Sequence, residues 1–95
     1  MRPLQHPDQL HLQGAIGWLE LGNYLEANEE LERIQPKLRA HTLVLRVRWD
    51  VYVKAKRWDG AQEISRALTE MLPDDPSVWL LHANSFYFAG DYAAA

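Results

Sequence analysis

Few side chains in this sequence have the types and spacing that chemistry requires. His6 and His11 lie five residues apart, a spacing found in zinc sites, but Pro7 separates them and the chain has no cysteine to supply a thiolate. His41 and His82 are far apart in the sequence, and nothing in their spacing joins them into a catalytic pair. The histidines therefore predict neither a metal site nor a catalytic base.

Two further patterns have simpler structural readings. Asp74 and Asp75 precede Pro76, which is typical of a helix start, so capping accounts for these carboxylates better than acid–base chemistry. The run Gly14-Ala15-Ile16-Gly17 imitates the GxxG loop of RNA-binding KH modules, but no Lys or Arg lies within ten positions of it. We therefore expect a protein without catalytic activity, cofactor or metal.

The composition limits the kinds of protein and partner that this sequence can represent. The 95 residues carry a formal net charge of -3 and are 47% hydrophobic, enough for one small domain with its own core. The acidic balance argues against nucleic acid and anionic lipid as partners. Prolines interrupt the N-terminus, and the apolar runs are far shorter than a membrane span, so we expect neither a signal peptide nor a membrane helix. We expect a cytoplasmic protein, in keeping with the lack of cysteine.

A repeat of 34 residues organises the chain. Aromatic residues recur in register at Trp18, Tyr52 and Phe86. A second motif, with a turn residue, then an aromatic and then a small residue, aligns without gaps in segments 22–27, 56–61 and 90–95. A fixed period in this range is typical of solenoid proteins, whose units stack on one another.

The repeat resembles the tetratricopeptide repeat family. In the second unit the resemblance rests on Tyr52, Trp58, Ala61, Leu68 and Pro73. In the third unit it rests on Trp79, Ala83, Phe86, Gly90, Tyr92 and Ala95. It implies an all-α fold in which antiparallel helix–turn–helix repeats stack as a right-handed α-solenoid. The units would be 8–41, 42–75 and a truncated 76–95, about two and a half repeats in a single domain, with 1–7 as an N-terminal extension.

Local signals place the helices near 8–21, 24–34, 42–55, 58–71 and 76–89, with a sixth begun after Gly90. Asp75 and Pro76 fit the N-cap and first position of the last helix, and Gly90 fits its C-terminal end. In the second unit's second helix, apolar residues recur every three or four positions and predict one buried face.

Three departures from the family pattern predict local differences. Trp49 stands where a small residue is usual, beside Arg48, so we expect the third helix to be rotated or loosely packed. Pro36 should end or kink the second helix about three residues early and leave a long turn. Lys56 replaces the glycine of the other turns, and must either adopt another conformation or bear a left-handed penalty of about 1 kcal/mol.

The family resemblance also implies a binding surface. In tetratricopeptide repeats the first helix of each unit lines a concave groove, and more than half of the matching positions here are apolar or aromatic. The Lys and Asn clamp of the co-chaperone subfamily is absent, with Ser77 among the residues at its positions. The expected groove residues are Leu12, Ile16, Leu19, Arg46, Val47, Asp50, Val53, Lys54, Leu80, Leu81, Asn84, Tyr87 and Phe88.

These observations lead to one functional expectation and two alternatives. We expect a protein-interaction module whose groove binds an apolar peptide or amphipathic helix, with Arg46, Asp50, Lys54 and Asn84 setting its orientation. One alternative is a structural module that forms homo-oligomers through its uncovered third repeat, for which the acidic first unit and the cations of the second offer complementary charge. The other is a regulatory segment of a larger enzyme, or a secretion chaperone.

Overall fold

The computed structural model describes the backbone of residues 7–94 and the side chains of residues 7–90. His6, the rest of the expected extension before Pro7, and Ala95 lie outside the described residues, as does the side chain of Tyr92. The described chain is all-helical, without a strand. Its elements are α1 (Asp8–Glu20), α2 (Tyr24–Glu32), a short 3-10 helix η1 (Pro36–Leu38), α3 (Thr42–Lys54), α4 (Trp58–Met71) and α5 (Pro76–Ala94).

Helix starts repeat with the period of the sequence. α1, α3 and α5 begin at residues 8, 42 and 76, and α2 and α4 begin at residues 24 and 58, all in steps of 34. The expected starts are therefore confirmed, and the ends of the first four helices agree within two residues. No described helix is both long and apolar enough to cross a membrane.

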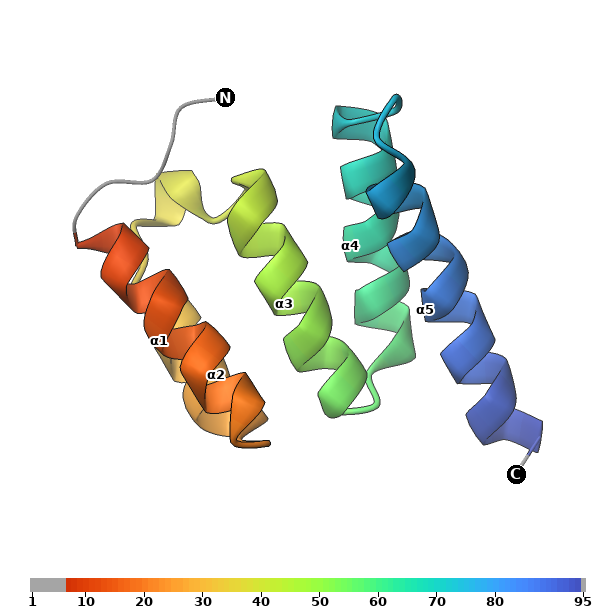
Figure 1. Cartoon of the computed structure of the whole chain (residues 1–95), viewed down its shortest axis with the longest axis horizontal. Helices are drawn as coiled ribbons and strands as arrows, with labels where there is room; N and C mark the ends of the chain where they lie inside the picture. Colours follow the sequence, from red (N-terminus) through yellow and green to blue (C-terminus); the bar gives the residue numbers. More distant parts are fainter. Residues whose placement is uncertain (1–6, 95) are drawn as a thin grey trace.

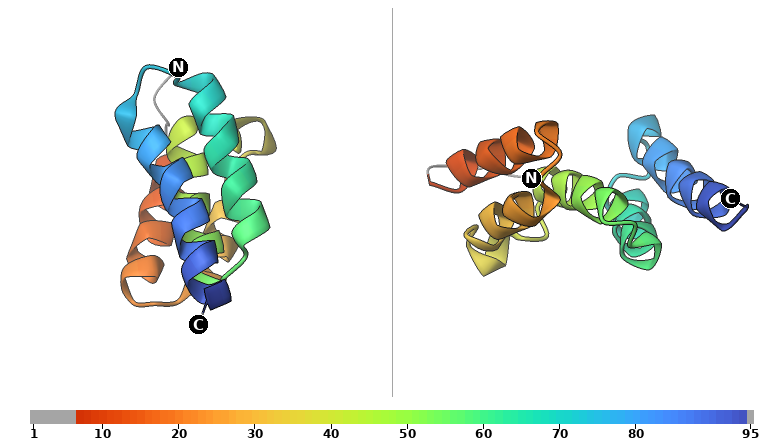
Figure 2. Two further views of the ribbon diagram at one scale, coloured as in Figure 1. Left: turned by 90° about the vertical axis from the view of Figure 1, so that its right-hand side faces the viewer. Right: turned by 90° about the horizontal axis from the view of Figure 1, so that it is seen from below.

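The helices pack as antiparallel neighbours in chain order (Figure 1). α1 packs on α2, α3 on α4, and α4 on α5, while α3 also contacts α1 and α2. Seen from below, α1 and α5 lie on one side of the array, α2 and α4 lie on the other, and α3 lies between them (Figure 2). The array measures 42 × 31 × 18 Å, and its packing is consistent with a helical repeat.

The turns after α1 and α3 both use a left-handed residue. Gly22 has φ +79°, and Lys56, its counterpart 34 residues on, has φ +59°. Lys56 therefore adopts the strained option considered from the sequence, at a cost of about 1 kcal/mol relative to glycine. The recurring turn geometry overrides the residue's own preference, because the two helices that it joins pack along their length.

α2 ends early, as Pro36 predicts. The helix stops at Glu32, and Pro36 opens the 3-10 turn that follows. Arg39 then satisfies carbonyls that the shortened helix leaves exposed, donating to the backbone oxygens of Glu32 at 2.8 Å and Ile34 at 3.3 Å. The expected long turn is thus held in one conformation by a cation at a helix C-terminus.

Small residues lie where the helices of each hairpin meet. Ala15, Ala27 and Ala61 are fully buried, and the main core joins the first two to residues of α1, α2 and α3. The ring of Tyr52 lies against Gly60, where an added Cβ would come within 3.1 Å of it. The close approach of α3 and α4 therefore depends on a residue without a side chain.

Trp49 and Arg48 are anchors of α3. The Trp49 indole is only 6% exposed and donates to the Ser85 hydroxyl of α5 at 2.7 Å. Arg48 reaches α2, where it donates to Asn28 Oδ1 at 3.2 Å and Glu32 Oε1 at 3.1 Å. The large residue at a small-residue position therefore fills the space between α3 and α5.

The third unit differs from the expectation. Pro76 begins α5, and Asp75 caps it by accepting the Ser77 N–H at 2.9 Å, so the predicted start is confirmed. The predicted end at Gly90 is wrong, because α5 continues through Gly90 to Ala94 and no sixth helix begins among the residues that the structure describes. Each further helical residue gains a backbone hydrogen bond, whereas a glycine inside a helix costs only about 1 kcal/mol.

Candidate functional site

The expected groove residues come from the three helices α1, α3 and α5. α1 and α5 flank α3 on one side of the array (Figure 2). Leu80 and Tyr87 are the most open of the apolar residues, with 61% and 67% of their surface exposed, and Asp50 and Lys54 are exposed as well. The half-buried members are Ile16, Leu19, Arg46, Val53, Leu81, Asn84 and Phe88.

Leu12 and Val47 offer almost no surface to a partner. They are 5% and 7% exposed and belong to the main hydrophobic core. α1 and α3 approach each other closely enough to pack these two side chains between them. The apolar surface on this side of the array therefore depends mainly on α5, with smaller contributions from Ile16 and Leu19 of α1 and from Val53 of α3.

Arg46 is engaged within the protein. Its guanidinium donates to Asp75 Oδ2 at 3.1 Å and to the Ser77 hydroxyl at 2.7 Å, which ties α3 to the first turn of α5. The hydroxyl and backbone N–H of Ser77 lower the pKa of Asp75, and Arg46 adds a smaller effect in the same direction. Arg46 thus fastens α5 in place, which limits its use as a free cation for a ligand.

Asp50 and Lys54 form the charged part of the surface. They lie one helical turn apart on α3, at a spacing that brings the side chains together. Partial removal of water from the Asp50 carboxylate raises its pKa, although the attraction of Lys54 opposes this shift. A ligand that presents a hydrogen-bond donor could satisfy this carboxylate.

The apolar part of the surface is one face of α5. Leu80 and Tyr87 are seven residues apart, which places them on the same side of a helix, with Asn84 between them. The Tyr87 ring packs edge-on against Phe88, with centroids 5.8 Å apart. No Asp, Glu, Lys or Arg occurs from Pro76 to Gly90, so this face of α5 carries no charge of its own.

A buried polar chain joins three helices, and the sequence reasoning missed it. Ser85 accepts from Trp49 and lies 3.2 Å from the Ser65 hydroxyl, which in turn lies 2.6 Å from His82 Nδ1. Ser65 and Ser85 are both fully buried, whereas His82 is half-buried, so these hydroxyls tie α3, α4 and α5 together inside the protein. The available signal was Trp49 at a small-residue position, since a buried indole needs an acceptor.

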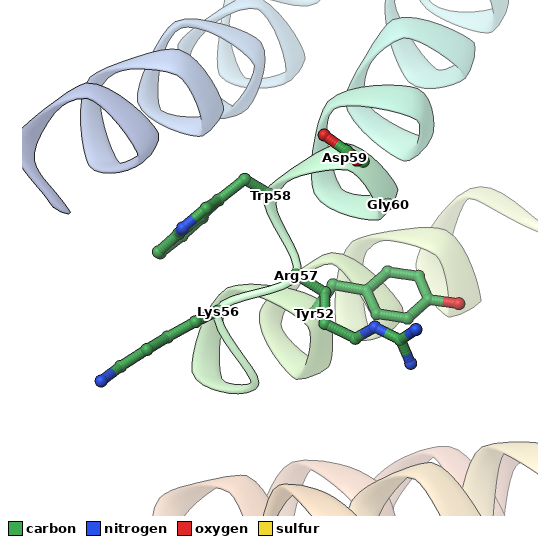
Figure 3. A pocket seen from close by; sticks show the side chains of 6 residues that line it. All are labelled: Tyr52, Lys56, Arg57, Trp58, Asp59 and Gly60. Atoms are coloured by element: carbon green, nitrogen blue, oxygen red, sulfur yellow. The ribbon is translucent and has the colours of Figure 1, made fainter. Parts of the chain in front are cut away.

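A hollow of about 460 Å³ lies at the turn between α3 and α4. It is lined by two cations and two aromatic rings, among other residues, but these do not converge. Lys56 and Trp58 point to one side of the chain, whereas Tyr52 and Arg57 point to the other (Figure 3). The turn therefore presents two separate edges rather than one enclosing site.

His11, one of the histidines singled out from the sequence, has a partner within the protein. His11 Nδ1 lies 3.1 Å from Glu30 Oε2 of α2, across the first hairpin. Within the described part of the chain, no group of three or more His, Asp or Glu side chains is placed to hold a metal ion. Comparisons with known proteins gave no relatives: no family model, no curated protein and no solved structure matches this chain.

Proposed function

We propose that this chain is a non-catalytic protein-interaction module, built as a tetratricopeptide-like right-handed solenoid, that binds an apolar peptide or amphipathic helix along α1, α3 and α5. The observation that carries this proposal is the pair Leu80 and Tyr87, which expose most of their surface on one face of a helix without charged residues. Apolar side chains grouped in this way favour contact with another protein over contact with water.

The composition of the face supports a particular kind of ligand. Leu80 and Tyr87 would receive apolar side chains spaced three or four residues apart, as on one side of an amphipathic helix. Asp50, Lys54 and Asn84 border the apolar part and would orient the ligand through hydrogen bonds to its polar side. Leu12, Val47 and Arg46 play a supporting part, because they are buried or bonded within the protein.

Selection from a random peptide library tests this proposal. We expect the selected peptides to carry apolar residues at three- and four-residue spacing, and to bind as synthetic peptides in isothermal titration calorimetry. The variant Leu80→Asp should weaken that binding by about tenfold or more, since it places a charge in a desolvated contact.

Leu25→Asp is the matched control. Leu25 lies on α2, in the other layer, and is 67% exposed, so the same substitution should leave the fold and peptide affinity unchanged. Circular dichroism and urea unfolding would establish that both variants fold. Equal affinities for Leu80→Asp, Leu25→Asp and the unmodified chain would exclude this face as the binding site.

A further inference from the structure

α5 has a second apolar face that the proposed peptide site does not use. Trp79, Ala83 and Phe86 follow one another at spacings of four and three residues, which forms a stripe along one side of the helix. Trp79 is 50% exposed and Phe86 is 52% exposed, and Ala83 between them is exposed as well. We call these three residues the outer stripe.

Equivalent positions in the first two units are covered by a neighbouring helix. Ala15, 68 residues before Ala83, is fully buried between α1 and α2. Tyr52, 34 residues before Phe86, packs its ring on Gly60 of α4. α5 packs on α4 through its opposite side, where Val78 and Ser85 are fully buried, so in the described structure no helix lies over the outer stripe.

The outer stripe is held rigidly. The Trp79 indole donates to the Pro73 carbonyl at 2.8 Å, which fixes the orientation of its ring. Phe86 packs edge-on against the His82 ring, with centroids 5.1 Å apart. Side chains already fixed in this way lose little conformational entropy when a partner covers them.

The arrangement of the stripe is self-complementary. Trp79 and Phe86 lie almost symmetrically about Ala83, so the order is large, small, large. If a second α5 lay antiparallel across the first, Ala83 would face its own copy at the crossing, and each Trp79 would lie beside the Phe86 of the other copy. Small residues permit a close crossing of two helices while large residues fill the space beside it.

Charge also favours a second copy as the occupant. From Pro76 to Gly90, α5 contains no Asp, Glu, Lys or Arg, so this stretch of the helix in one copy meets the same stretch of the other without like-charge repulsion. A contact between identical faces closes upon itself with two-fold symmetry and does not propagate into a filament. We propose that the outer stripe binds the outer stripe of a second copy of this chain, with the α5 helices antiparallel and Ala83 at the two-fold axis.

The area of the stripe sets the expected strength. Trp79 and Phe86 each expose about half of their surface, which together offers about 200 Å² for burial in each copy. Even with the flanking residues added, this area is well below the area that a stable dimer buries. The dimer should therefore be weak, with a dissociation constant on the order of 0.1 mM. In sedimentation equilibrium the average mass should rise above 11.0 kDa as the concentration increases through that range.

Engineered cysteines test the geometry directly, because the chain contains none of its own. Ala83→Cys should form a disulfide-linked dimer at least about tenfold faster than Leu25→Cys, an exposed control on α2. Trp79→Cys alone should cross-link poorly, since antiparallel copies would place these positions about 12 Å apart along the axis. Mixing Trp79→Cys with Phe86→Cys should restore cross-linking.

Three results would overturn the proposal. These are a mass that stays at 11.0 kDa up to about 1 mM, an Ala83→Cys rate equal to that of Leu25→Cys, or preferential self-linking of Trp79→Cys, which would indicate parallel helices. Phe86→Glu, on the side of the stripe away from Leu80, should abolish the rise in mass and leave peptide binding intact. Lys54→Ala, on α3, should weaken peptide binding and leave the rise in mass unchanged. The two proposals can therefore fail independently of each other.

Discussion

The first two hairpins and α5 carry the same sequence motif but differ in structure. At Gly22 and Lys56 the chain turns with positive φ and a second helix packs back, whereas at Gly90 the helix simply continues. Lys56 shows that a turn forms even with an unfavourable residue, and Gly90 shows that a favourable residue does not by itself end a helix. Tertiary packing of the following helix therefore decides whether this motif becomes a turn.

The largest expected difference concerns the small residue at the eighth position of the first and third repeats. Ala15 is fully buried between α1 and α2, so Ala15→Leu should lower the free energy of unfolding by about 1–3 kcal/mol through overpacking. Ala83, at the same position of α5, is exposed. Ala83→Leu should therefore change the free energy of unfolding by less than about 0.5 kcal/mol. Urea unfolding at low protein concentration measures both. A similar loss in the two variants would mean that α5 is covered like α1.

The turn residues should respond in opposite directions. Gly22 has φ +79° and open space around it, so Gly22→Ala should cost about 1 kcal/mol from backbone strain alone. Gly90 lies inside α5, again with open space around it, so Gly90→Ala should stabilise the protein by about 0.5–1 kcal/mol. Thermal unfolding gives the sign directly. Destabilisation by Gly90→Ala would show that the chain turns there, as it does at Gly22.

The smallest effect should come from the joint between α3 and α5. Hydrogen bonds from Ser77 lower the folded-state pKa of Asp75, so this carboxylate stabilises the protein above its unfolded pKa, near 4. That contribution is lost as the pH falls below 4 toward the lowered value. Asp75→Asn should therefore reduce stability at neutral pH and flatten the decline in acid, as measured by urea midpoints from pH 2 to pH 7. The neighbouring substitution Asp74→Asn serves as the control, and an acid decline unchanged by Asp75→Asn would contradict this role.

Local patterns were sufficient to predict most of the helices. The repeat gave the starts at Tyr24, Thr42, Trp58 and Pro76, and Pro36 explained the early end of α2. These features depend on residues close together in the sequence, where capping, proline geometry and hydrophobic spacing act. Gly90 misled the same reasoning, since its outcome depends on what packs beyond it.

The candidate site was predicted less well, because it depends on how closely helices approach. Leu12 and Val47 were expected on the open face but lie in the core, since α1 packs close to α3. Arg46 was expected to meet a ligand but pairs with Asp75, 29 residues away. Apolar spacing identifies the side of a helix, but it cannot distinguish a side chain that faces solvent from one that faces the neighbouring helix.

The 18 Å thickness of the array has a further consequence. Two helices laid side by side already span about that distance, so the described residues form a slab two helices thick. In such a slab, substitutions on one broad face should have little effect on the other face, because the two layers share only the residues buried between them.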